Sequence, residues 1–280
     1  MAQSSGPTGD LSGFVSIIAS YEHRVGHACR AVAGHIPALL TGLPSKPVIF
    51  DNACGTGAAT EELLKVLPSA RIYAADAVPP MVQSTKAIVA AKPELQKSVV
   101  QVEIMDGQEL RYENDFFDAS ITNFGIFFFP DPALGAREVH RTLKQGGIAV
   151  LTLWKEFGFK PVLWEVQKRV KPANPLTELP LMEPWCDGSK LKQTLQEGGF
   201  TSIEMTTVTE GMWGTGRKDL ESVLLENFQA MVARNWTDDE KTKLPAVTAQ
   251  VLDDHEADFC IKSGAKVGVP MTAWVAVCRK

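Results

Sequence analysis

The sequence lacks a basic excess and any long apolar run, and each absence removes a class of protein. Lys and Arg number 28 in 280 residues against 33 Asp and Glu, which leaves a formal charge of −5. A broad nucleic-acid surface normally needs a basic excess, so no nucleic-acid partner is expected. No apolar run approaches the roughly 18 residues that a membrane span requires, so no membrane span is predicted.

Cysteines are few, odd in number and scattered. The five of them contain no CxxC pair, which argues against a disulfide framework and against a zinc site. The start of the chain, residues 1–13, is polar and rich in Gly and Ser, without the pattern of a secretory signal. We therefore predict a disordered lead-in over 1–13, reduced thiols, a cytoplasmic protein and no metal site.

Apolar residues are plentiful enough for a full core, at 45% of the chain. Short apolar strands alternate with helices, a rhythm that predicts βαβ units and a mostly parallel sheet with helices on both faces. The five strands expected in this part are 47–51, 70–75, 99–105, 117–124 and 148–154.

The flanking segments have a different pattern. Apolar spacings of three and four predict a helix over 14–43. After residue 154, helical insertions are expected at 155–188 and 217–265, and alternating strands at 201–213 and 272–278. We predict a single domain over 14–280, with its core at 44–154 and the three helical segments as a lid.

The loop 51–57 (DNACGTG) lies between the first expected strand and a helix. Its glycines permit a tight turn and a close approach of a ligand to the backbone. A dinucleotide site would want Gly or Ala at position 60, where this chain has Thr60. The acidic Asp51 before the loop suits a ligand with a cationic group better than a pyrophosphate.

Two further aspartates end the next two strands. Asp76 can accept two ribose hydroxyls, and its other interpretation is a helix cap. Asp106 can accept a hydrogen bond from the exocyclic amine of an adenine that lies between Val78 and Met105. Alternatively, Asp106 is only a turn residue. The carboxyl ends of parallel strands share one edge of the sheet, so three such aspartates predict a nucleoside-type ligand.

Four stretches together resemble the class I S-adenosylmethionine-dependent methyltransferases, in their UbiE/Coq5-like branch. They are DNACGTG, AVPPMV after Asp76, DGQELRYENDFFDASITNFGIFFFPDP and EVHRTLKQGGIAVLTLW. The later stretch ending NWTDDEKTKLPAVTAQVLDD is similar to small fungal methyltransferases of secondary metabolism, including those that methylate thiols of gliotoxin-type compounds. The resemblance implies an α/β, Rossmann-like, seven-stranded mostly parallel sheet with a helical lid. It also implies S-adenosyl-L-methionine as cofactor and S-adenosyl-L-homocysteine as product.

The resemblance assigns roles to individual residues. Asp51 and loop 53–57 would hold the methionine end of the cofactor, Asp76 the ribose, and Ala77 and Met81 the adenine. Asp106 and Gly107 would meet the polar edge of the adenine, Asn123 the sulfonium, and Tyr21 would close over the carboxylate. The cofactor residues expected in full are Tyr21, Asp51, Ala53, Cys54, Gly55, Thr56, Gly57, Asp76, Ala77, Met81, Asp106, Gly107 and Asn123.

The substrate and the acceptor atom are less constrained. Phe124, Phe128, Trp154 and Trp213 would suit a small apolar or heteroaromatic substrate, although packing in the core explains such rings equally well.

A general base is needed only if the acceptor must lose a proton. His23 and His27, four residues apart on the N-terminal helix, are the candidates, against a reading as solvated helix residues. Oxygen is the favoured acceptor on general frequency, with sulfur close behind from the fungal resemblance and nitrogen third. A monomer and a homodimer both stay open. Rival functions are a same-fold cofactor-binding protein with a regulatory or cyclase role, and an NAD-dependent reductase.

Overall fold

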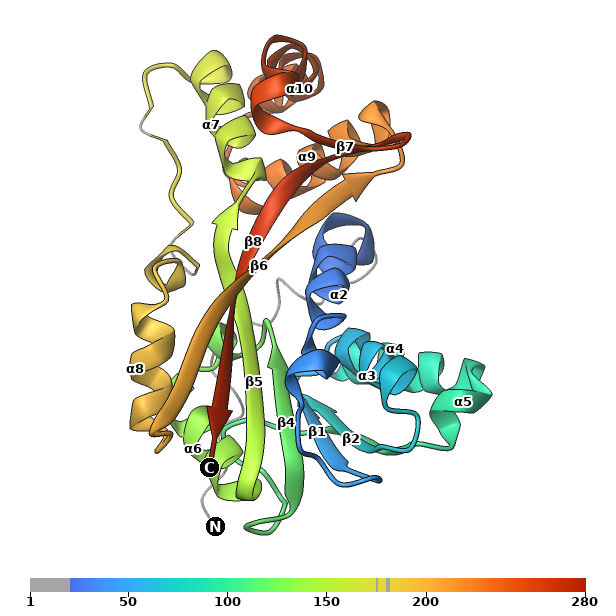
Figure 1. Ribbon diagram of the computed structural model, residues 1–280. Helices are drawn as coiled ribbons and strands as arrows, with labels where there is room; N and C mark the ends of the chain where they lie inside the picture. Colours follow the sequence, from blue (N-terminus) through green and yellow to red (C-terminus); the bar gives the residue numbers. More distant parts are fainter. Residues whose placement is uncertain (1–20, 175, 180–181) are drawn as a thin grey trace, which may run out of the picture.

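The computed structural model describes residues 21–174, 176–179 and 182–280, and within them the chain forms one twisted sheet (Figure 1). Its order is β3-β2-β1-β4-β5-β8-β6, with β7 paired to β8. The five strands from β3 to β5 are mutually parallel, and β8 runs antiparallel between β5 and β6. The strands are β1 (Val48–Asn52), β2 (Arg71–Asp76), β3 (Val99–Ile104), β4 (Phe117–Asn123), β5 (Leu143–Phe157), β6 (Ser202–Gly214), β7 (Ile261–Ser263) and β8 (Lys266–Arg279).

Helices cover both faces of the parallel half because its strands are apolar on both sides. On β5, Ile148 and Val150 pack with α3, whereas Ala149 and Leu151 face the cluster that contains α6 and α8. The helices of this half are η1 (Glu22–Gly26), α2 (His27–Ala33), η2 (Ile36–Leu39), α3 (Ala58–Val66), α4 (Pro79–Ala91), α5 (Pro93–Gln96), η3 (Ile126–Phe128), α6 (Pro132–Thr142) and α8 (Ser189–Glu197).

The antiparallel half is a long ribbon that rises beyond the parallel strands (Figure 1). Strands β5, β8 and β6 form it, and α7, α9 and α10 pack around its far end. The N-terminal α2 lies between the two halves and contacts both α3 and β6. The remaining helices are α7 (Phe159–Val170), η4 (Glu183–Trp185), α9 (Arg217–Met231) and α10 (Asp238–Phe259).

The predicted mostly parallel sheet with helices on both faces is confirmed, with eight strands among the described residues instead of seven. The additional strand, β7, is a three-residue hairpin partner of β8 inside a segment that was expected to be helical. The helix expected at 14–43 continues only to Ala33, where Gly34 ends it. The lead-in 1–13 and residues 14–20 lie outside the described residues. No helix that the structure describes has the length and apolarity to cross a membrane.

Candidate functional site

A cavity with about 920 Å³ of open space lies where β1, β2 and β4 end and the chain leaves β3. This is the edge at which open α/β sheets bind ligands. The residues that line it are Tyr21, Cys29, Asp51, Ala53, Cys54, Gly55, Thr56, Ala58, Ala59, Asp76, Ala77, Val78, Met81, Met105, Asp106, Gly107, Asn123, Phe124, Gly125, Phe128, Phe129 and Pro130.

The loop between β1 and α3 forms one wall of this cavity. Its backbone turns through left-handed conformations at Gly55 (φ 55°) and Gly57 (φ 82°), which glycine adopts without strain. A Cβ on Gly57 would lie 3.2 Å from the Thr85 side chain, so α4 packs directly against the loop. The Thr85 hydroxyl also donates to the Gly55 carbonyl at 2.8 Å. The loop is therefore held in shape by α4 before any ligand arrives.

Asp51 is fully buried at the end of β1 and lines the cavity. Its Oδ2 accepts two bonds from Thr60, one from the amide at 3.0 Å and one from the hydroxyl at 2.6 Å. Its Oδ1 is buried without a partner. Burial raises the pKa of this carboxyl from its ordinary 3.8 to about 7, and the Thr60 bonds only partly oppose that shift. An unsatisfied, destabilised carboxylate oxygen of this kind fits a cationic group such as an ammonium.

Asp76 uses both carboxylate oxygens to organise the backbone around the cavity. One oxygen accepts from Gly55 N at 2.9 Å, and the other from Val78 N at 2.8 Å at the start of α4. Burial raises the pKa of this carboxyl, against the effect of the two amides. Each oxygen keeps a lone pair for a further donor. Asp76 can therefore cap the start of α4 and accept the ribose hydroxyls at the same time.

Asp106 and Gly107 line the same cavity, just after the end of β3. Asp106 Oδ1 accepts from the amide of Gln108 at 2.9 Å, as expected of a turn residue. Gly107 is required by close packing, because a Cβ there would lie 2.4 Å from Phe129 and 2.8 Å from Asn52 Oδ1. The missing side chain lets Phe129 reach the cavity wall.

The residue directly after β4, Phe124, is strained and lies at the cavity. Phe124 has φ of 55°, uncommon for a non-glycine residue and frequent at functional sites. The Thr152 hydroxyl accepts from Phe124 N at 3.1 Å and donates to Asn123 Oδ1 at 2.8 Å. Asn123 Nδ2 in turn donates to Cys29 O at 3.3 Å, which joins α2 to the end of β4. The ring of Phe124 faces the cavity, and Trp154 stacks behind it at 4.2 Å.

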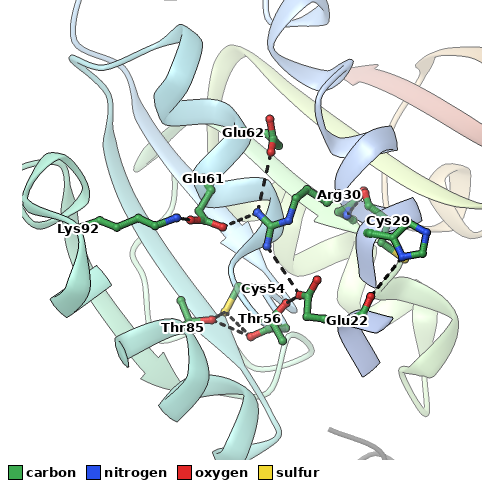
Figure 2. A network of polar contacts seen from close by, with 12 residues as sticks. Glu22, Cys29, Arg30, Cys54, Thr56, Glu61, Glu62, Thr85 and Lys92 are labelled. Atoms are coloured by element: carbon green, nitrogen blue, oxygen red, sulfur yellow. Dashed lines mark hydrogen bonds and ion pairs between the residues drawn. The ribbon is translucent and has the colours of Figure 1, made fainter. Parts of the chain in front are cut away.

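A polar network fastens the N-terminal helices to the loop and to α3 (Figure 2). The Thr56 hydroxyl donates to Glu22, and Arg30 lies 3.7 Å from the same carboxylate. Arg30 also pairs with Glu61 of α3, which Lys92 contacts from its other side. Burial works to raise the pKa of Glu61, but Lys92 and Arg30 outweigh it and hold that pKa below its usual value. Because Tyr21 and Cys29 line the cavity, this network holds part of the cavity wall in place.

We expect Arg30→Ala to release S-adenosylhomocysteine about five to ten times faster. The substitution removes a partly buried ion pair, worth about 1 kcal/mol, that fastens α2 to α3. Stopped-flow displacement of the bound nucleoside would measure the rate. Arg111→Ala, which removes an exposed pair with Glu103 at 3.2 Å, is the matched control. Equal release rates in the two variants would contradict the role of Arg30 in fastening α2 to α3.

The two histidines proposed as bases do not line the cavity. His23 places one ring nitrogen 3.0 Å from Asp219 and the other 3.2 Å from Glu226, and Asp219 raises its pKa. Burial lowers the pKa of His27, whose Nε2 accepts from Trp213 N at 2.8 Å. Its Nδ1 lies 3.3 Å from the carbonyl of Glu22. Both nitrogens of each ring thus have partners, which leaves no free lone pair for a substrate.

We predict that His23→Gln and His27→Gln keep turnover within about threefold of the parent, where loss of a general base would cost 100-fold or more. Steady-state rates at saturating cofactor would measure this. His23 has a raised pKa when folded, so its contribution to stability is present at low pH and is lost as the pH rises through that pKa. A 100-fold loss of rate in either variant, with cofactor affinity unchanged, would show that the substituted histidine acts as a general base.

The cavity brings together most of the residues that the sequence singled out. Of the expected cofactor residues, all but Gly57 line it, as do Phe124 and Phe128. Trp154 and Trp213 do not: Trp154 lies behind Phe124, and a Cβ on Gly211 would lie 2.1 Å from the Trp213 ring. Lining residues that sequence reasoning missed are Cys29, Ala58, Ala59, Gly125, Phe129 and Pro130. Of these, only Phe129 carried a sequence signal, because it belongs to the run of phenylalanines that follows β4.

Comparison with known proteins agrees with this geometry. A family model described as a methyltransferase domain matches residues 50–151. The Aspergillus fumigatus methyltransferase tpcH is 25% identical over 215 residues, which are 71% of this chain and 73% of that protein. The acetylaranotin bis-thiomethyltransferase of Aspergillus terreus is 25% identical over 82% of this chain and 80% of its own. UbiE of a Geobacter strain is 31% identical over 39% of this chain and 46% of its own.

Solved structures share the fold at low identity. The [4+2]-cyclase SpnF superposes with a TM-score of 0.53 at 18% identity, covering 99% of both chains. The YcgJ protein of a Bacillus species gives 0.52 at 12% identity, covering 91% of this chain and 99% of that one. The domain match and the methyltransferase relatives support an S-adenosylmethionine-dependent methyltransferase.

Proposed function

We propose that this enzyme transfers the methyl group of S-adenosylmethionine to a heteroatom of a small natural product. The observation that carries the proposal is the buried, unpartnered Oδ1 of Asp51 in a cavity that Asp76 and Asp106 also line. An ammonium group and a nucleoside are what this set of acceptors would bind. Relatives such as the acetylaranotin bis-thiomethyltransferase, which matches across most of this chain, support a natural product as substrate.

The cofactor residues would divide the ligand between them. Asp51 would hold the ammonium, Asp76 the ribose hydroxyls, and Asp106 the polar edge of the adenine. Met81 and Met105 are apolar lining residues suited to the adenine faces. Bound S-adenosylmethionine supplies a methyl group already activated by the positive charge on sulfur. The chain's own contribution is alignment of the acceptor and exclusion of water.

The acceptor we favour is sulfur, with oxygen second and nitrogen third. A thiol has an ordinary pKa near 8.5 and forms thiolate in water without help from the protein. An aliphatic hydroxyl needs a base, and both ring nitrogens of His23 and of His27 already have partners. Burial keeps the pKa of the lining Tyr21 well above its usual value, so that phenol is a poor base at neutral pH. The thiol-methylating relative points to the same acceptor.

A two-part experiment tests this function. Calorimetry should show saturable binding of S-adenosylhomocysteine and none of NADH. Label from methyl-labelled S-adenosylmethionine should then appear in benzenethiol more readily than in phenol or aniline, with a rate that rises with the thiolate fraction. Binding without transfer to any acceptor, from this panel or from metabolite extracts, would favour the regulatory or cyclase alternative. NADH binding alone would favour a reductase.

A further inference from the structure

Strand β5 has one polar side chain in its buried stretch 148–154, that of Thr152. Thr152 is fully buried in the middle of the sheet, where it pairs with Asn123 of β4 and Val275 of β8. Valine has nearly the same shape, suits a strand equally well and would bury no polar group there. The two hydrogen bonds of the Thr152 hydroxyl lead to Asn123 and Phe124, which both line the cofactor cavity.

The neighbours of Asn123 determine the orientation of its amide. Asn123 Nδ2 lies 3.3 Å from Cys29 O, which can only accept a hydrogen bond, so the nitrogen of the amide must face α2. The amide oxygen then faces the Thr152 hydroxyl at 2.8 Å, which has to donate its one hydrogen there. A lone pair of the same hydroxyl accepts from Phe124 N at 3.1 Å. The network therefore has one consistent set of donors and acceptors, and the hydroxyl is at its centre.

This network joins three elements at the cavity: β4, β5 and α2. Phe124, directly after β4, has a strained φ of 55°, and its amide donates to both the hydroxyl and the backbone carbonyl of Thr152, at 3.1 and 3.2 Å. Cys29 belongs to α2 and lines the same cavity as Asn123 and Phe124. The position of α2 relative to the end of β4 thus depends on the Asn123 amide, which the Thr152 hydroxyl orients.

We propose that Thr152 is a positioning residue for methyl transfer, acting through Asn123 on the part of the cavity that receives the acceptor. This inference rests on the proposed function, in which the protein contributes mainly alignment and exclusion of water. Alignment is sensitive to small movements, since a misplacement of about 1 Å can cost on the order of 100-fold in rate. Thr152 is not among the residues that line the cavity, so its effect on the acceptor is indirect.

Thr152→Val removes the hydroxyl, keeps the shape, and leaves Phe124 N its bond to the backbone carbonyl at position 152. With benzenethiol as acceptor, kcat should fall about tenfold while the affinity for S-adenosylhomocysteine stays within about threefold of the parent. Thr152→Ser keeps the hydroxyl and should restore kcat. Thr142→Val is the matched control, because Thr142 is equally buried and its hydroxyl donates to Glu138 O at 2.9 Å in α6, outside the cavity lining. An equal loss of kcat in the two Val variants would overturn the role of Thr152.

A double-mutant cycle tests whether the hydroxyl acts through Asn123. In the Asn123→Ala background, Thr152→Val should lower kcat by less than about twofold, because the amide that the hydroxyl orients is already absent. The same tenfold loss in both backgrounds, or a parent-like kcat in Thr152→Val alone, would contradict the proposal.

The side-chain amide of Asn123 provides a measurement that needs no turnover. With S-adenosylhomocysteine added, its ¹⁵N–¹H signals, identified by their loss in Asn123→Ala, should coincide in the parent, Thr152→Ser and Thr142→Val. They should shift or broaden in Thr152→Val, and unchanged signals there would overturn the orienting role of the hydroxyl. A parent that transfers no methyl group would instead overturn the proposed function, while the amide signals would still decide whether Thr152 fixes Asn123.

Discussion

Asp51→Asn is expected to weaken S-adenosylhomocysteine binding by about 100-fold, roughly 3 kcal/mol, while stabilising the free protein at pH 8. The affinity falls because the neutral amide loses the charge that would pair with the ligand ammonium. The stability rises because the substitution removes a buried carboxylate with an unpartnered oxygen. Calorimetry and thermal unfolding at pH 8 would measure the two opposite effects. They have opposite signs, so a general defect in folding cannot mimic them.

The Asp51 carboxyl also determines how the stability of the fold and the affinity for the ligand depend on pH. Its pKa rises from 3.8 in the unfolded chain to about 7 in the fold, so the unfolded chain ionises first as the pH increases. This group therefore favours folding fully below pH 4, and its contribution is lost as the pH rises toward 7. Affinity for the cationic ligand should run the other way, rising up to about pH 7 and then levelling.

In Asp51→Asn both pH dependences should be reduced, and the parent protein serves as control under identical buffers. Thr60 can still donate to the amide oxygen, so the local bonds survive the change. Unchanged ligand affinity in the variant, or a parent affinity that falls between pH 5 and pH 7, would contradict the role of Asp51.

Asp76→Ala is expected to weaken binding of S-adenosylhomocysteine by about 2–4 kcal/mol, on the scale of charged hydrogen bonds. Two losses contribute: the ribose acceptors, and the bonds that hold the amides of Gly55 and Val78 at 2.9 and 2.8 Å. The measurement is a titration monitored by calorimetry at pH 8.

Comparison of two ligands separates these losses. S-adenosylhomocysteine and its 2′,3′-dideoxy analogue should bind the parent with very different affinities and Asp76→Ala with similar ones. Should the variant discriminate between them as strongly as the parent, the ribose assignment would fail, whatever the absolute loss. Asp118→Ala removes a carboxylate that accepts from Val48 N at 2.8 Å, away from the cavity, and controls for general destabilisation.

The sequence predicted that the proposed cofactor residues lie together at one edge of the sheet, because the position of each depends on local chain geometry. Asp51, Asp76 and Asp106 follow or end successive strands, and parallel strands bring those ends to one edge without any further information. The glycine at 107 also marked a close approach, although its partner, Phe129, could not be named from the pattern.

The sequence was less informative where a role depends on contacts between distant segments. His27 appeared suited to a base by type and helix position, but its Nε2 meets an amide 186 positions away on β6. Trp154 ends a predicted strand near the site, but it does not line the cavity. The backbone conformation at Phe124 stacks the Phe124 ring against the Trp154 ring, and Phe124 lines the cavity instead. Apolar rings carry no periodicity that distinguishes a cavity wall from the packing beneath it.

The position of β8 in the sheet has a consequence for how the chain folds. Strands β1 to β5 pair among themselves and can assemble before β8 is synthesised. Strand β6 finds its partner only in β8, which must enter between β5 and β6. Until residues 266–279 have left the ribosome, one side of β5 and the whole of β6 remain unpaired edges. Those exposed edges are where a nascent chain of this protein would be most prone to aggregate.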